Sequence, residues 1–155
     1  MATIDDVARV ASELPEVTEG ERHGNLTWFV SGKAFAWDRP FSKADIKRFG
    51  DLTPPEGPIL AVRVLDLADK EAVLSVHPKS FFTIPHFEGF SAVLITLRTV
   101  TTKALREAII DAWLACAPRD LADHYLEARV PSSSLAPDRP PAGRTTRKRP
   151  PRRSV

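Results

Sequence analysis

The stretch HGNLTWFVSGKAFAWDRP, residues 23–40, decides the fold class. It contains two short runs rich in aromatic and β-branched residues, LTWFV (26–30) and KAFAWDR (33–39), joined by a Ser-Gly pair. Two such runs separated by two turn-forming residues predict a β-hairpin. The stretch also raises the question of whether its aromatic side chains form a binding surface or belong to the core.

The second run of this hairpin alternates small and large side chains. Ala34 and Ala36 alternate with Phe35 and Trp37. Because successive side chains of a strand point to opposite faces, one face is small and the other bulky. The small face favours close packing of another element, most simply a helix.

The rest of the chain divides into segments with helical or strand patterns. Thr3 and Ser42 are each followed three residues later by an aspartate, as in a capping box, which predicts that helices begin there. The polar segment 16–24 is interpreted as turn-rich. The remaining predictions are helices over 66–76, 101–117 and 118–130, with a break at Pro118, and strands over 58–65, 81–84 and 91–97.

The order of these elements predicts the architecture. Helix, hairpin, helix, strand, helix, hairpin, helix, helix fits an α+β domain of two layers, with an antiparallel sheet and helices mainly on one face. Strands that arrive as hairpins argue against a doubly wound parallel sheet.

Composition separates a folded body from a tail. Residues 131–155 contain six prolines and no aromatic residue, which predicts a disordered tail after a single domain over 1–130. The tail has seven Lys/Arg and one acid, a net charge of +6, whereas residues 1–130 carry 15 Lys/Arg and 19 Asp/Glu, a net charge of −4. The basic pI therefore comes from the tail.

Cysteine content and hydropathy indicate the compartment. Cys116 is alone, which excludes an intramolecular disulfide, and its apolar surroundings predict a buried, inert thiol. The acidic, amphipathic N-terminus differs from a signal peptide, and no apolar run reaches the ~18 residues of a membrane span. We expect a soluble cytoplasmic protein without a membrane partner.

Three segments resemble the MmcQ/YjbR family of small bacterial proteins: LPEVTEGERHGNLTWFVSGKAFAW, FFTIPHFEGFSAVLITL and AWLACAPRDLADHY. The most specific parts are G-K-x-F-A at Gly32–Ala36 and H-x-x-G at His86–Gly89. The resemblance covers roughly residues 3–126 and implies a two-layer α+β domain with an antiparallel sheet, similar to secretion-chaperone-like folds. Members are often labelled DNA-binding because the fold has been likened to a double-wing arrangement, so the resemblance implies nucleic-acid binding.

Histidines and one lysine are the first candidates for ligand contact. His86 lies in a glycine-containing loop between two strands, where an imidazole can meet a ligand. Glu88 would complete a His/carboxylate metal pair, but no third ligand is near in sequence, so neither a metal nor a cofactor is expected. His23 and Lys33 flank the hairpin and are candidates for an anion. A structural histidine and a solvated lysine are the simpler alternatives.

The aromatic residues of the hairpin allow two interpretations. Trp28, Phe29, Phe35 and Trp37 would stack bases if the sheet were an exposed platform. Alternating aromatic residues on a hairpin are more often core on one face and cross-strand pairs on the other. We predict that Trp28 or Trp37 is largely buried, and Trp28 is kept as a ligand-binding candidate.

Basic residues suggest a nucleic-acid partner, and no catalytic constellation is present. There is no nucleophile elbow, P-loop or dinucleotide fingerprint, so an enzyme is not expected. We predict a non-enzymatic nucleic-acid-binding protein with weak, sequence-independent affinity for DNA or RNA. The alternative is a protein-, peptide- or small-ligand-binding module that uses the sheet face or the His86 loop. The residues proposed to contact phosphates are Arg144, Arg147, Lys148, Arg149, Arg152 and Arg153 in the tail and Arg39, Lys43, Lys47 and Arg48 in the body.

Overall fold

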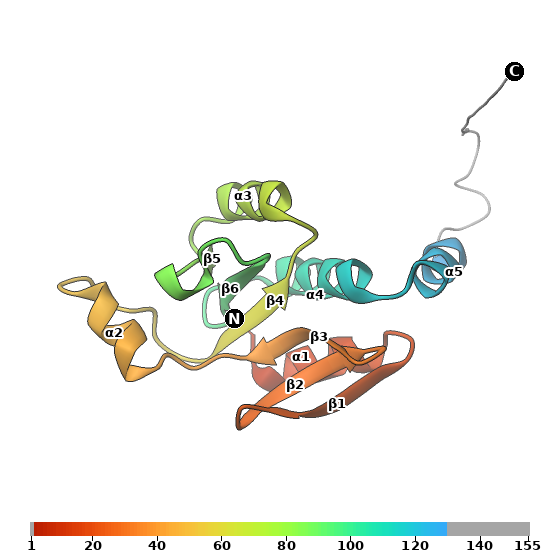
Figure 1. The fold of residues 1–155 in the computed structure, drawn as a ribbon, viewed down its shortest axis with the longest axis horizontal. Coiled ribbons are helices and arrows are strands. Elements are labelled where there is room, and N and C mark those ends of the chain that lie inside the picture. The colour runs from red at the N-terminus through yellow and green to blue at the C-terminus, as the bar shows by residue number, and fades with distance from the viewer. Residues whose placement is uncertain (1, 130–155) are drawn as a thin grey trace, which may run out of the picture. The chain divides into compact units, whose positions relative to one another are not determined.

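A six-stranded sheet runs through the computed structural model, which describes residues 2–129. The strand order is β1-β2-β3-β4-β6-β5, and every neighbouring pair is antiparallel. Figure 1 shows the β1–β2–β3 meander on one side of β4, and β6, β5 and α3 on the other. The predicted α+β class with an antiparallel sheet is confirmed. The strands are β1 (Val17–Arg22), β2 (Asn25–Val30), β3 (Lys33–Asp38), β4 (Ile59–Arg63), β5 (Phe81–Phe82) and β6 (Ala92–Thr96).

Strand β1 corrects the interpretation of segment 16–24 as turn-rich. Val17–Arg22 pairs along its whole length with β2 and forms an edge of the sheet. Its side chains are exposed or only half-buried, as is common for a strand at the edge of a sheet. The strand therefore lacks the apolar alternation by which strands are recognised in a sequence.

The hairpin of residues 26–39 is confirmed as β2–β3. Its pairing shifts between Trp28 and Phe29, which oppose Ala36 and Ala34, so that Phe35 is the extra residue of a β-bulge. Helix α4 (Thr102–Cys116) packs against β3, as the small side chains predicted. The Cys116 sulfur lies 3.9 Å from the Ala34 carbonyl oxygen, and burial raises the pKa of this thiol. The prediction of a buried cysteine is confirmed.

Both predicted capping boxes are present. The Thr3 hydroxyl accepts a hydrogen bond from the Asp6 N–H, and the Asp6 carboxylate accepts one from the Thr3 N–H. Ser42 and Asp45 repeat this exchange. The other helices are confirmed with small changes at their ends. The bounds are α1 (Ile4–Ser12), α2 (Lys43–Phe49), α3 (Leu67–Val76), a 3₁₀ turn η1 (Pro85–Phe87) and α5 (Arg119–Arg129), the last preceded by the break at Pro118.

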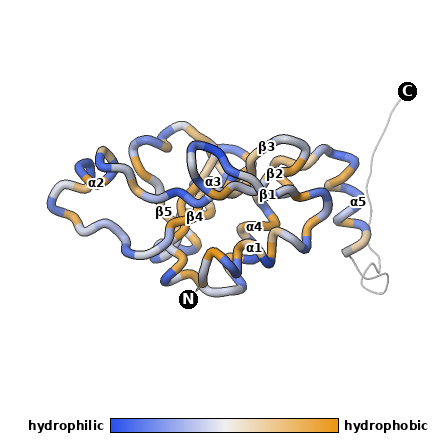
Figure 2. Tube along the Cα trace, turned by 90° about the horizontal axis from the view of Figure 1, so that it is seen from below, coloured by the Kyte–Doolittle hydropathy of each residue, from blue (hydrophilic) through white to orange (hydrophobic). Residues whose placement is uncertain are grey.

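The two faces of the sheet are covered differently. On one face α4 packs against α1, β3 and β4, and Figure 2 shows hydrophobic segments gathered where α1 and α4 adjoin. On the other face a smaller cluster around Ile59, Ala61 and Leu94 is covered by η1 and by aromatic side chains of the α2 region. No helix within residues 2–129 is long and apolar enough to cross a membrane.

The chain divides after Pro118 into two units. Residues 2–118 hold the sheet and helices α1–α4, and α5 belongs to the second unit. The predicted disordered tail, 131–155, lies outside the described residues.

Candidate anion-binding groove

A groove of about 860 Å³ lies where four separate segments of the first unit meet. The segments are the β1–β2 turn, the end of β3 with the loop that follows it, helix α2, and the η1 loop. We call this site the Arg39 groove. The residues that line it are Arg22, His23, Asn25, Thr27, Trp37, Arg39, Pro40, Phe41, Ser42, Ala44, Asp45, Arg48, His86, Phe87 and Phe90.

The lining of the Arg39 groove is strongly biased toward cations. Arg22, Arg39 and Arg48 line it together with two histidines, against a single carboxylate, that of Asp45. This contrasts with the net charge of −4 on residues 1–130. The fold therefore gathers positive charge at one place on an otherwise acidic body, and such a concave basic site attracts anions.

Aromatic rings form one wall of the groove. The Trp37 ring lies 6.5 Å from Phe87 and 6.3 Å from Phe90, centroid to centroid. The Arg22 guanidinium lies 5.9 Å from the Trp37 ring centroid, and that of Arg39 lies 5.6 Å from the Phe87 centroid. Phe87 is buried, whereas Trp37 is half-buried and Phe90 is 39% exposed. The wall thus offers ring surface and charge side by side.

Asp45 fixes the position of Arg39. The Asp45 side chain is almost fully buried, and its Oδ2 accepts hydrogen bonds from Arg39 Nη1 at 2.9 Å and from the Ser42 N–H at 2.9 Å. Burial raises the pKa of Asp45, but the hydrogen bonds from Ser42 and Arg39 outweigh it and hold the pKa below its usual value. A guanidinium carries five N–H donors, so Arg39 retains donors for an oxyanion while Asp45 holds it in place.

Lys70 holds the backbone of the segment that carries Phe87 and Phe90. Its side chain reaches from α3 and is buried, and its Nζ donates to the Phe87 carbonyl at 2.7 Å and to the Phe90 carbonyl at 2.8 Å. Burial lowers the pKa of Lys70, and the negative charge of Glu88 partly offsets this. The lysine thereby ties both ends of segment 87–90 to α3 and sets the orientation of the two rings.

The comparison with protein families assigns this fold. Residues 12–115 match the family model described as YjbR. The chain belongs to the YjbR family. It is 42% identical over 129 residues to "Uncharacterized protein Mb2600" of Mycobacterium bovis and to "Uncharacterized protein Rv2570" of Mycobacterium tuberculosis, covering 81% of this chain and 97% of each relative.

A solved structure is similar to this YjbR fold. The crystal structure of Deinococcus radiodurans protein DR2400, described with the domain DUF419, matches with a TM-score of 0.57 and 22% identity. The match covers 84% of this chain and 91% of that one. This likeness shows the fold, and together with the family match it confirms the resemblance found in the sequence.

Four of the predicted site residues meet in the YjbR domain's groove. His23, Arg39, Arg48 and His86 all line it, although 63 positions separate the two histidines. His86 and Glu88 are not joined by a third ligand, because residues 2–129 hold no group of three or more His, Cys, Asp or Glu side chains placed to bind a metal ion. The positive charge of the groove comes from its three arginines.

One predicted ligand contact, Trp28, is wrong, and another, Lys33, lies far from His23. Trp28 is 1% exposed and its Nε1 donates to Glu19 Oε1 at 3.1 Å, so it is a core residue that no ligand reaches. Lys33 starts β3, at the opposite end of β2 from His23. At ~3.3 Å per residue the two backbones are roughly 20 Å apart, too far to hold one anion together.

The other basic candidates within the described residues are outside the groove. Lys43 and Lys47 are exposed on α2 and do not line it. The tail residues Arg144–Arg153 lie outside the described residues. Sequence reasoning missed Arg22 and Phe90 as groove residues, and the supporting Lys70, although Arg22 stands directly before the histidine that was singled out.

His23 occupies an unfavourable backbone conformation. His23 and Gly24 both have positive φ, 55° and 80°, as type I′ turns require, and Ser31 and Gly32 repeat this at the β2–β3 turn. Asparagine is the residue that type I′ turns prefer before glycine, ahead of histidine and serine. We expect His23→Asn to raise the free energy of unfolding by about 0.5 kcal/mol, measured as a higher Tm in circular dichroism.

Ser31→Asn is the matched control, since it introduces the same residue at the same position of the turn that is remote from the groove. Both variants should raise the Tm by similar amounts. A lower Tm for His23→Asn beside a higher one for Ser31→Asn would mean that the imidazole stabilises the fold, and would contradict a role confined to ligand contact.

Proposed function

We propose that this YjbR-family protein is a non-enzymatic nucleic-acid-binding module that holds a single-stranded segment in the Arg39 groove. The observation that carries the proposal is the convergence of Arg22, Arg39 and Arg48 beside the partly exposed rings of Trp37 and Phe90. The basic tail is proposed to add contacts that do not depend on sequence.

The chemistry of the groove suits a single strand. Arginine side chains neutralise phosphates and supply most of the affinity of sequence-independent binding. Aromatic rings next to a basic groove stack unpaired bases, which a duplex keeps in its interior. A groove set into the domain surface also suits a flexible strand better than a rigid double helix.

A second candidate function uses the same groove for a small ligand. The volume of about 860 Å³ beside His86 falls within the range of small-molecule sites, and a phosphorylated compound with a planar ring matches its charges and its aromatic wall. A mononucleotide is the simplest probe of that chemistry. Strong competition by a mononucleotide against an oligonucleotide would favour this second candidate.

The test compares two pairs of cations in the full-length chain. We expect Arg22→Gln/Arg48→Gln to weaken binding of a fluorescent 12-nucleotide oligothymidine about ten-fold at 100 mM salt. The slope of log K against log salt should become shallower by about 1.4, or 0.7 for each phosphate of the single strand that is no longer neutralised. Fluorescence anisotropy at several salt concentrations measures both.

Lys43→Gln/Lys47→Gln is the matched control, because it removes the same charge from exposed positions outside the groove. It should change the affinity less than two-fold. Equal losses in both pairs would contradict a site in the groove. If only a full-length variant with all seven tail cations changed to glutamine loses binding, the tail alone carries the affinity.

A further inference from the structure

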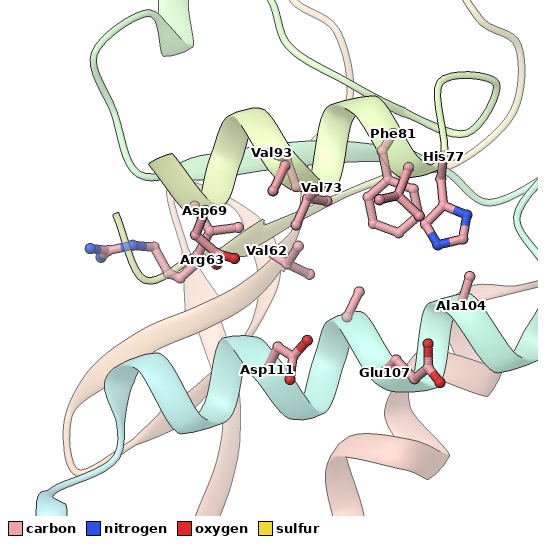
Figure 3. Close-up of a pocket in the computed structure, with 14 residues that line it drawn as sticks. Val62, Arg63, Asp69, Val73, His77, Phe81, Val93, Ala104, Glu107 and Asp111 are labelled. Carbon is pink, nitrogen blue, oxygen red and sulfur yellow. The ribbon is translucent and has the colours of Figure 1, made fainter. Parts of the chain in front are cut away.

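A second cavity lies between α3, α4 and the sheet (Figure 3). Its volume is about 180 Å³, and its floor is formed by Val62 and Val93, which pair across β4 and β6 and are almost fully buried. We call it the valine cleft. None of the residues that line it lines the Arg39 groove.

The cleft exists because two helix faces carry small side chains toward each other. Ala72 and Val73 of α3 and Ala104 and Ala108 of α4 line opposite sides. The full lining follows helical spacing, with positions 69, 72, 73 and 76 on α3 and positions 104, 107, 108 and 111 on α4, which places each set on one face of its helix. Their side chains are too short to fill the space above the valines, and Val76 at one end is 68% exposed. The cleft is therefore apolar and open to solvent.

Carboxylates surround this apolar space. Asp69, Glu107 and Asp111 all line the cleft, and Figure 3 shows Glu107 and Asp111 on the side of α4 that faces α3. The lining also includes the His77 imidazole at the end of α3 and Arg63, but the Arg63 side chain extends away from the space. Its Nε donates to the Ser91 carbonyl at 3.1 Å, and its guanidinium lies 5.2 Å from the Phe90 ring centroid.

We propose that the valine cleft binds an organic cation: a protonated amine on an apolar body about the size of a benzene ring. A dry protein cavity of ~150 Å³ is enough to hold benzene, so a cleft of about 180 Å³ accepts such a body. The carboxylates at its rim attract an ammonium group and repel a carboxylate of the same shape. The ligand class is opposite in charge to that of the Arg39 groove, so the inference stands independently of the proposed function.

The experiment titrates three ligands of similar shape into the ¹⁵N-labelled full-length protein at pH 7. They are 2-phenylethylammonium, 2-phenylethanol and 3-phenylpropionate, and the readout is the change in amide chemical shifts. We expect the ammonium ion to bind about five-fold more tightly than the alcohol, and the carboxylate to bind most weakly. The shifts should concentrate in α3, α4, β4 and β6. Equal binding of all three ligands, or shifts elsewhere, would overturn the proposal.

Variants locate the site. Glu107→Gln should weaken ammonium binding about two- to five-fold, whereas Glu71→Gln, the same change on α3 outside the cleft, should leave it unaltered. Ala108→Leu fills the cleft and should weaken binding at least ten-fold while the spectrum stays that of a folded protein. If Ala108→Leu fails to fold, the charge series and Glu107→Gln still decide. An unchanged affinity of Glu107→Gln for the ammonium ion would contradict the proposed site.

Discussion

Trp28→Ala is expected to lower the free energy of unfolding by about 4 kcal/mol, because truncating a fully buried aromatic side chain is among the most destabilising substitutions. The Trp28 side chain is 1% exposed, and it lies within the first unit opposite Ala36. Removing the indole leaves a large cavity and also deprives Glu19 of its hydrogen bond. Urea denaturation followed by circular dichroism measures the change.

Trp37→Ala is the matched comparison on the neighbouring strand. Trp37 is half-buried beside the Arg39 groove, so its loss should destabilise the protein by about 2 kcal/mol, roughly half as much, and should weaken oligonucleotide binding. Trp28→Ala should leave that affinity unchanged under conditions where it is folded. If both variants kept wild-type stability and lost binding, the hairpin would be a recognition surface and its assignment to the core would be wrong.

Asp45→Asn is expected to lower the free energy of unfolding at pH 7 by about 3 kcal/mol, the low end of the range for breaking a buried ion pair. Asparagine has nearly the same shape and can still accept the Ser42 N–H. The loss therefore comes from leaving Arg39, whose side chain is 16% exposed, without its counter-ion. Arg48 is nearly half-exposed and 3.5 Å away, so it contributes less.

The pH dependence of this loss tests its ionic origin. The folded-state pKa of Asp45 lies below its ordinary value of 3.8, so the stabilisation is fully present above pH 3.8 and disappears as the pH falls through the lowered pKa. The difference between wild type and Asp45→Asn should accordingly shrink below pH 3.8. Asp51→Asn, at an exposed position just after α2, should change stability little at any pH. A difference that persists unchanged into strong acid would contradict the ionic explanation.

Most of the fold followed from local patterns in the sequence. The Thr3–Asp6 and Ser42–Asp45 spacings predicted helix starts correctly, because a capping box is satisfied within four residues. The β2–β3 hairpin followed from its Ser-Gly turn. Strand β1 could not be found in this way, since its pairing with β2 supplies hydrogen bonds and demands no hydrophobic side chains.

The groove depends on contacts that no local pattern contains. Arg22, Arg48 and His86 come together only because β1 ends near β3, while α2 and η1 cover the same face of the sheet. The burial of Lys70 could not be predicted either, since a lysine in a short helix normally indicates a solvated surface. Lys70 can be buried because its ammonium group donates hydrogen bonds to the backbone carbonyls of Phe87 and Phe90. These carbonyls lie 17 and 20 positions further along the chain.

The polarity of β1 has a consequence for self-association. As an edge strand, β1 presents unpaired backbone groups that another copy of the chain would extend into a larger sheet. Glu19, Glu21 and Arg22 lie along this strand, and charged side chains on an edge strand disfavour its pairing with a second copy. The opposite edge, β5, is only two residues long and offers a poor template. The polar composition that made β1 difficult to predict from the sequence thus also disfavours edge-to-edge aggregation of the sheet.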